Sequence, residues 1–219
     1  PTDSIPVPVE DRFSPTSTPG AARETLGMPH STPVIGMVGK IARNRGFEVL
    51  LEAAHRTRNP CRVLAVGHGE EQPILQDRAH ALGIADRITW AGKREEDLPL
   101  LFAAMDADVF AAPGSDWGHR VVSEAQACGR PVIARPVPGI GDLLDHNRSG
   151  LVAGDAQEIA DAFDRLIDDP ELAQRLAIGG AQAAADRRMV PVGKKMASFL
   201  EGIQQKSGFT NRGAERISF

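Results

Sequence analysis

Short apolar runs that end near glycine or proline alternate along this chain with segments of helical periodicity. The first run, PVIGMVG at 33–39, is followed by Phe47, Leu50, Leu51 and Ala54 at the spacing of one helix face. The pattern predicts strands at 33–39, 61–67, 87–92, 107–113, 131–135 and 150–153, with helices from about 47 and near 70–82, 96–105 and 118–128. Strands that alternate with helices in this way are typical of an α/β domain with a mostly parallel sheet, here of about six strands.

The remainder of the chain is predicted to be mainly helical. Apolar residues keep helical spacing from 159 to 167, Pro170 suits the first turn of a new helix, and the pair Gly179 and Gly180 is expected to interrupt that helix. A further amphipathic helix is predicted at 194–204. The expected organisation is a proline-rich linker leading into the domain at 1–32, a ligand-binding α/β domain at 33–190, a C-terminal amphipathic helix at 191–206 and a polar tail at 207–219.

Composition excludes several classes of protein. The net charge of −4 argues against nucleic acid as a partner, but it is compatible with a local basic site for a small anion. Cys61 and Cys128 form no CxxC pair, so we expect buried free thiols in a cytoplasmic setting. The six histidines lack metal-ligand spacing, so we expect no metal. No apolar run reaches the roughly 18 residues of a membrane span, and the start at Pro1 within a proline-rich stretch indicates a piece of a longer protein.

Three cations crowd the turn after the first predicted strand. Lys40, Arg43 and Arg45 stand where the next helix begins, and a helix N-terminus carries partial positive charge that disfavours cations. An anion bound at this turn would offset the repulsion and also meet free backbone N–H groups. Alternatively, the long side chains reach into solvent, away from the helix dipole.

The segment after the fourth predicted strand, SDWGHRVVSE at 115–124, carries two carboxylates. Asp116 lies just before a helix start and could be a simple N-cap, whereas His119 and Arg120 fall in the first turn. Glu124 follows two turns later among apolar neighbours, so it is either a solvent-facing residue or a partly buried carboxylate that needs hydrogen-bond donors. Two basic helix starts at one end of a sheet indicate a phosphate-bearing ligand between them, and the glycines of VGHGEE (66–71) line the same edge.

Several of these segments together resemble a known family. The stretches IPVPVEDRFSP, GMVGKIARNRGFEVLLEAA, LGIADRITWAGKREEDLPLLFAAMDADVFAAPGSD and EAQACGRPVIARPVPGIGDLLDHNRSGLVAGD are similar to the C-terminal domain of retaining glycosyltransferases of the glycosyl transferases group 1 type. The resemblance extends from about residue 5 to 203. It implies a Rossmann-like, three-layer domain that forms the C-terminal, nucleotide-sugar-binding half of a GT-B architecture.

The resemblance also implies roles for individual residues. The family's Glu-x7-Glu motif falls on Asp116 and Glu124, so Asp116 would contact the donor sugar and Glu124 would accept hydrogen bonds from the ribose hydroxyls. Lys40 and Arg45 match the family's cations on the diphosphate, and with Asp116 they are the expected catalytic residues. Further donor contacts are implied at Gly39, Lys93 (through backbone that edges the base), Trp117, Gly118, His119, Arg120 and Val121.

This sequence departs from the family pattern at specific positions. Asp116 is one methylene shorter than the usual Glu, Lys40 and Arg45 exchange the usual residue types, and His119 stands where the family usually has glycine. The His119 side chain could therefore crowd the donor sugar or form a hydrogen bond with it. Pro113 to Asp116 is also one residue shorter than common forms.

The sequence therefore predicts the donor-binding domain of a hexosyltransferase that acts on a glycan or lipid-linked acceptor, with no cofactor and with the nucleotide-sugar as substrate. The N-terminal, Rossmann-like acceptor domain is expected to be missing, so the isolated chain should transfer little or no sugar. Membrane association, and an acceptor at a membrane surface, would come through that missing domain. The alternatives are a non-catalytic nucleotide-binding or assembly module with a decayed site, and an epimerase or phosphorylase of the same architecture.

Overall fold

The computed structural model describes residues 7–15, 19–112 and 119–207, with side chains up to residue 201. Its centre is a six-stranded parallel sheet in the order β3-β2-β1-β4-β5-β6. The strands are β1 (Val34–Val38), β2 (Arg62–Val66), β3 (Ile88–Gly92), β4 (Ala107–Phe110), β5 (Val132–Ala134) and β6 (Leu151–Val152). The predicted α/β class and the number of strands are confirmed, although β4 ends at Phe110 rather than at 113.

Eight helices accompany the described part of the sheet. They are α1 (Pro19–Thr25), α2 (Phe47–Arg56), α3 (Gln72–Ala81), α4 (Leu98–Ala104), α5 (His119–Ala127), α6 (Ala156–Asp168), α7 (Pro170–Ala185) and α8 (Met189–Ser207), with short 3₁₀ turns at Ala85–Arg87 and Ile140–Asp142. α6 begins at the N-cap Asp155, whose carboxylate accepts hydrogen bonds from the backbone N–H groups of Gln157 and Glu158.

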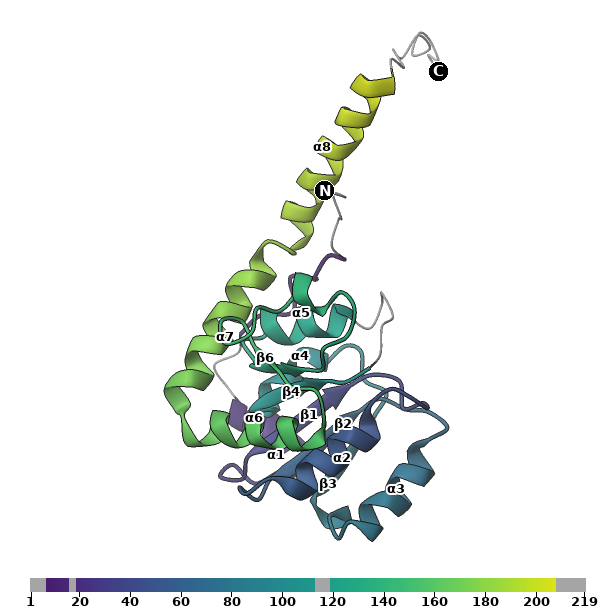
Figure 1. The fold of residues 1–219 in the computed structure, drawn as a ribbon, viewed down its shortest axis with the longest axis vertical. Coiled ribbons are helices and arrows are strands. Elements are labelled where there is room, and N and C mark those ends of the chain that lie inside the picture. Colours follow the sequence, from purple (N-terminus) through teal and green to yellow (C-terminus); the bar gives the residue numbers. More distant parts are fainter. Residues whose placement is uncertain (1–6, 16–18, 113–118, 208–219) are drawn as a thin grey trace.

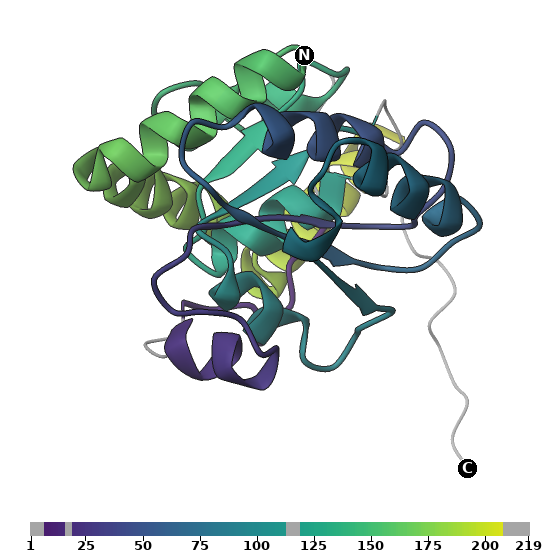
Figure 2. The same cartoon turned by 90° about the horizontal axis from the view of Figure 1, so that it is seen from below.

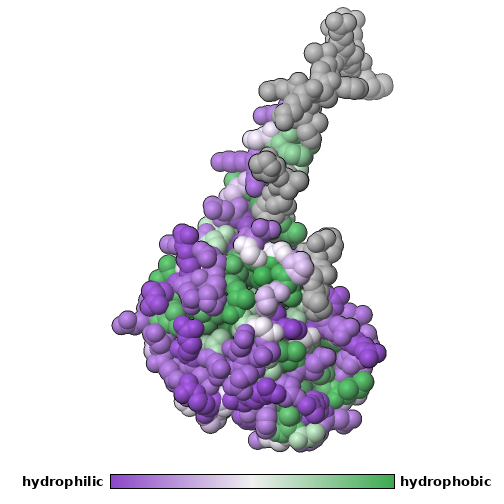
Figure 3. Space-filling view, in the orientation of Figure 1, coloured by the Kyte–Doolittle hydropathy of each residue, from purple (hydrophilic) through white to green (hydrophobic). Residues whose placement is uncertain are grey.

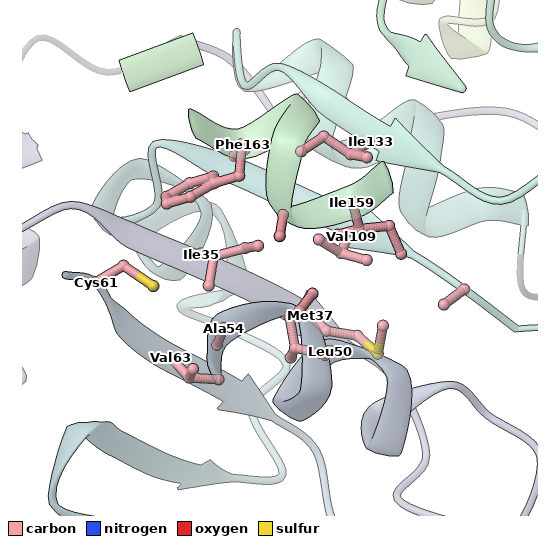
Figure 4. Packing of buried hydrophobic residues seen from close by; sticks show 14 of the residues in the cluster. Ile35, Met37, Leu50, Ala54, Cys61, Val63, Val109, Ile133, Ile159 and Phe163 are labelled. Carbon is pink, nitrogen blue, oxygen red and sulfur yellow. The ribbon is translucent and has the colours of Figure 1, made fainter. Parts of the chain in front are cut away.

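The sheet lies between two layers of helices (Figure 2). Alternate strand residues point to opposite faces, so Ile35 belongs to the core under α2 and α6, whereas Val34 belongs to the core under α1, α4 and α5. Figure 4 shows how Ile35 and Val109 of the strands meet Ile159 and Phe163 of α6. The predicted helix face of Phe47, Leu50, Leu51 and Ala54 is buried in that same core.

One prediction about the helices is wrong. Gly179 and Gly180 do not interrupt a helix, because α7 is continuous through both. A Cβ at Gly179 would overlap the carbonyl oxygen of Arg148, and a Cβ at Gly180 would lie 3.2 Å from that of Ser149. The glycines therefore allow close approach of α7 to this turn. The predicted last helix is confirmed, and it begins at Met189 rather than at 194.

The N-terminal residues include a helix that the proline-rich sequence did not predict. α1 packs against α4, with Ala22 fully buried. Arg23 fixes it by donating to the Ala104 carbonyl at 3.0 Å and by pairing with Asp106 at 2.7 Å. At the opposite end of the chain, α8 projects away from the sheet (Figure 1). Within the described residues, no helix is long and apolar enough to cross a membrane.

Both cysteines are free and buried, as the sequence predicts. Burial raises the pKa of the Cys128 thiol to about 12, and it also raises the pKa of Cys61. Both thiols therefore remain protonated at neutral pH.

Candidate functional site

The carboxyl ends of β1 and β4 form the point where the strand order reverses. From β1 the chain crosses to β2 on one side, whereas β4 leads to β5 on the other. Ligands of open parallel sheets bind at such a crevice. The two loops meet directly, since a Cβ at Gly46, which precedes α2, would lie 2.9 Å from the carbonyl oxygen of Ala111, just after β4.

Backbone hydrogen bonds at glycines connect the ends of the neighbouring strands β1, β2 and β3. The Gly39 N–H donates to the Val66 carbonyl at 2.9 Å, and the Gly67 N–H donates to the Gly92 carbonyl at 2.8 Å. Gly67 has φ +142° and no room for a side chain, because a Cβ would overlap the carbonyl oxygen of Gly39. The VGHGEE glycines therefore serve close backbone packing, while Gly39 itself borders open space.

The predicted basic residues lie around this edge, and Lys40 and Lys93 each contact an acidic residue. Lys40 is 63% exposed, and its Nζ lies 3.8 Å from a carboxylate oxygen of Glu70. Lys93 directly follows β3, and its Nζ lies 2.7 Å from Glu95. Arg45 is half-buried in the turn that leads into α2. Lys40 and Arg43 extend towards solvent, which is compatible with both interpretations of this turn.

Of the residues predicted near the start of α5, Asp116, Trp117 and Gly118 lie outside the described residues. His119, the first residue of α5, packs its ring on Phe110 at a centroid distance of 5.5 Å. Gly139 also adjoins the His119 ring, because a Cβ at Gly139 would lie 3.0 Å from the imidazole Cε1. The buried Nε2 of His119 has no hydrogen-bond partner among the described residues. His119 thus fills the space between the ends of β4 and the loop after β5.

Glu124 is only 3% exposed, so the interpretation of a solvent-facing glutamate is wrong. The Nε of Arg120, one helical turn earlier, donates to its Oε1 at 2.5 Å. Burial raises the pKa of Glu124, while the hydrogen bond and the charge of Arg120 oppose that increase. The half-buried Val121 packs beside them in the core under α5. Of the two interpretations of Glu124, the buried carboxylate is therefore confirmed, and its hydrogen-bond donor comes from its own helix.

Two acidic residues near Glu124 were not predicted as part of a site. Glu10 accepts a hydrogen bond from Nη2 of Arg120 at 3.0 Å, although 110 residues separate them. Asp108 of β4 is fully buried, and neither carboxylate oxygen has a partner among the described residues. Burial, followed by the charge of Glu124, raises the pKa of Asp108 well above its ordinary value. The protonated form of Asp108 is thus favoured in the folded protein.

A cleft of about 910 Å³ adjoins the start of α5. It is lined by His119 and Arg120 from α5, by the 138–145 segment and by residues of the α7–α8 junction that include Arg187. The sequence predicted the α5 residues but assigned no role to the loop after β5. Among the described residues, no hydrogen bond or ion pair links Lys40 or Lys93 to Glu124, so the two halves of the predicted site border the same edge without direct contact.

Comparison with known proteins assigns this arrangement to a family. The profile of the glycosyl transferases group 1 family matches residues 32–169. The chain belongs to the glycosyl transferases group 1 family. It is 36% identical over 185 residues to a D-inositol 3-phosphate glycosyltransferase of Corynebacterium jeikeium, covering 77% of this chain and 43% of that protein. The chain spans about half the length of the curated relatives it matches.

Solved structures of other proteins share the fold. Anabaena HepE, solved in complex with UDP and glucose, superimposes with a TM-score of 0.82 at 24% identity, covering 89% of this chain and 55% of HepE. The C-terminal domain of the group 1 protein LpcC from Francisella tularensis gives a TM-score of 0.74 at 22% identity, covering 83% of this chain and 99% of that domain. The predicted Rossmann-like half of a GT-B architecture is therefore confirmed.

The described edge is suited to binding a polar, anionic ligand. It combines the N–H groups at the starts of α2 and α5 with exposed cations and one buried carboxylate. Among the described residues, no group of three or more His, Cys, Asp or Glu side chains could hold a metal ion.

Proposed function

We propose that this chain is the donor-binding half of a retaining glycosyltransferase, which transfers a hexosyl group from a nucleoside diphosphate sugar to a glycan or lipid-linked acceptor. The observation that carries the proposal is Glu124, a buried carboxylate held by Arg120 at the carboxyl edge of a group 1 domain. A buried carboxylate costs stability unless it is well partnered, so its presence at a ligand-binding edge supports a binding role.

Each predicted residue has a role in this proposal. Glu124 accepts hydrogen bonds from the ribose hydroxyls, Asp116 contacts the sugar, and backbone near Lys93 borders the base. Transfer breaks the bond between the sugar and the leaving phosphate, and negative charge then grows on the diphosphate. Lys40 and Arg45, with N–H groups at the start of α5, stabilise that charge. Removing one such donor typically slows a reaction by about 10²–10³.

The acceptor site belongs to a second Rossmann-like domain outside this chain. The support is that the chain spans about half of its relatives, together with the exposed apolar residues of α8. Val190, Phe199 and Leu200 are each at least 41% exposed on this projecting helix, where Figure 3 shows hydrophobic and hydrophilic side chains side by side. We expect this face to pack against the missing domain, and membrane association would also come through that domain. The chain alone should therefore show little or no turnover.

A non-catalytic nucleotide-binding module is the second candidate. It is favoured by His119, because the imidazole packs against Gly139 in space that a donor sugar could otherwise use. Replacing His119 with glycine would then increase affinity for a nucleotide-sugar more than affinity for the nucleoside diphosphate alone.

Calorimetric titration of this chain with UDP-, GDP- and ADP-sugars tests the donor site. We expect binding of one of them, and we expect the double variant Lys40→Ala with Arg45→Ala to abolish it. The control is Arg175→Ala with Lys194→Ala, which removes two exposed cations from α7 and α8 and should leave binding unchanged. Absence of binding to all three donors would refute the proposed function, as would equal loss in both double variants.

A further inference from the structure

Within the described part of the chain, Glu124 receives its hydrogen bond on one carboxylate oxygen. Among the described residues, Arg120 donates to Oε1 at 2.5 Å, which leaves Oε2 for another donor. The Arg120 side chain is 36% exposed and lines the cleft, whereas the Glu124 side chain is only 3% exposed. Arg120 therefore links the buried carboxylate to the wall of the cleft.

Arg120 is in turn held from outside its own helix. Its Nη2 donates to Oε1 of Glu10 at 3.0 Å, while Oε2 of Glu10 accepts from Nε of Arg12 at 2.9 Å. The guanidinium thus donates to two carboxylates, which favours one orientation of its plane. Fixed charge-assisted hydrogen bonds of this kind define geometry as well as energy.

The segment that carries Glu10 is anchored to the α7–α8 junction. The Val9 N–H donates to the carbonyl of Arg187 at 2.7 Å, and Nη1 of Arg188 donates to the carbonyl of Glu10 at 3.0 Å. Val9 and Phe13 are fully buried on either side of Glu10. Residues 9–13 are therefore a built part of the domain, and they present Glu10 to Arg120 from a fixed backbone.

We propose that Arg120 is a positioning residue, held by Glu10, that keeps Glu124 ionised and oriented so that Oε2 is presented to the ribose hydroxyls of the donor. This inference rests on the proposed function for its ligand, but the chain of contacts from residues 9–13 to Glu124 is independent of it. Residues 9–13 thus complete the proposed ribose site. Because the Arg120 guanidinium occupies Oε1 of Glu124, Oε2 can accept hydrogen bonds from the two ribose hydroxyls.

The buried Glu124 carboxylate needs a nearby positive charge to remain ionised. Asp108 of β4 and Cys128, the residue after α5, can carry only negative charge, so neither can compensate the charge of Glu124. Arg120 is the largest charged influence that favours the ionised form of Glu124, ahead of Arg12, whereas the charge of Glu10 opposes it weakly.

The test compares the chain with Arg120→Leu, Arg120→Lys and, as a matched control, Arg56→Leu. Arg56 also forms an i,i+4 ion pair, with Glu52, but on α2 and away from this edge. Affinities for UDP, GDP and ADP and for their 2′-deoxy forms are measured by calorimetry from pH 5.5 to 8. We expect the chain and Arg56→Leu to bind one ribonucleotide with the same pH profile, in which the terminal phosphate of the ligand titrates at about pH 6, and to prefer it to the deoxy form.

In Arg120→Leu the arginine no longer offsets the effect of burial on Glu124, so the carboxyl group should stay protonated up to a higher pH. Affinity at pH 6 should then be about 10-fold lower than that of Arg56→Leu, since a charged hydrogen bond is lost, and the preference for ribose should disappear. Arg120→Lys should restore part of both properties. A pH profile equal to that of Arg56→Leu, with an intact ribose preference, would overturn the inference.

A second readout needs no nucleotide. Carboxyl ¹³C NMR follows the titration of Glu124 directly, and its pKa should rise in Arg120→Leu but not in Arg56→Leu. Glu10→Gln removes a negative charge that itself raises the pKa of Glu124, so a rise in that variant would show that loss of the Arg120 contact outweighs loss of the charge. An unchanged pKa in Arg120→Leu overturns the inference, and an unchanged or lower pKa in Glu10→Gln overturns the part played by residues 9–13. If the chain binds no nucleotide, the proposed function fails, and the NMR titration still decides whether Arg120 controls Glu124.

Discussion

The buried acid of β4 gives the sharpest prediction about stability. Asp108 lies between β1 and β5, is fully buried and has no hydrogen-bond partner for either oxygen among the described residues. Burial and the nearby Glu124 charge raise its pKa in the folded protein. The folded chain therefore holds a proton that the unfolded chain has released above its ordinary pKa of about 3.9.

The sign of the pH dependence follows from that difference. Because the folded state binds more protons, the free energy of unfolding falls as pH rises, by about 1.4 kcal/mol per pH unit, from about pH 3.9 up to the raised pKa of Asp108. Asp108→Asn keeps the shape and cannot ionise, so it lacks this contribution. Relative to the unchanged chain, the variant should gain about 2.7 kcal/mol over two pH units within the window.

Urea unfolding of both proteins at half-unit steps from pH 4 to 8 measures this gain. Glu124 also titrates with a raised pKa, but that contribution is present in both proteins and largely cancels in the difference. A difference in unfolding free energy that stays constant with pH would refute the reasoning, because it would mean that Asp108 has an ordinary pKa or a partner that compensates its charge.

Three further substitutions test how the domain is held together. Gly67→Ala should cost about 2–4 kcal/mol, because the residue has φ +142° and its Cβ would overlap the Gly39 carbonyl, and urea unfolding would show a lower midpoint. Asp164→Asn should lower the free energy of unfolding by about 2–3 kcal/mol near neutral pH, since the Asp164 carboxylate accepts hydrogen bonds from the Asn59 backbone N–H and side chain. Although burial raises the pKa of Asp164, such hydrogen bonds lower it overall, so the loss of stability should shrink as pH falls below about 4. Asp155→Ala should cost about 1 kcal/mol through loss of the α6 N-cap, seen as a lower thermal midpoint with unchanged helix content.

Most of the sheet could be predicted because its strands are short, buried and apolar on both faces. The features that the local pattern could not predict depend on residues that are far away in the sequence. α1 is fixed by Arg23 and Asp106, which are 83 residues apart, and α7 continues through Gly179 and Gly180 because another segment needs the space there. In both cases tertiary packing overrides local propensity.

The site was predictable where its signal is local. Arg120 and Glu124 are four residues apart, which is the spacing of facing side chains on a helix, so their pairing was within reach of the sequence. Asp108 was also visible as an acid within an apolar strand. The Glu10 contact was not predictable, because no local pattern connects a proline-rich N-terminal segment to a helix 110 residues later.

The central claim is that a nucleoside diphosphate binds at the carboxyl edge beside Glu124. A crystal structure of this chain with the nucleoside diphosphate selected by titration tests it directly. We predict that the ribose hydroxyls lie within hydrogen-bond distance of the Glu124 carboxylate, and that the diphosphate lies at the start of α5, within reach of Lys40 or Arg45. A nucleotide bound elsewhere on the chain, with Glu124 contacted only by Arg120, would contradict the account.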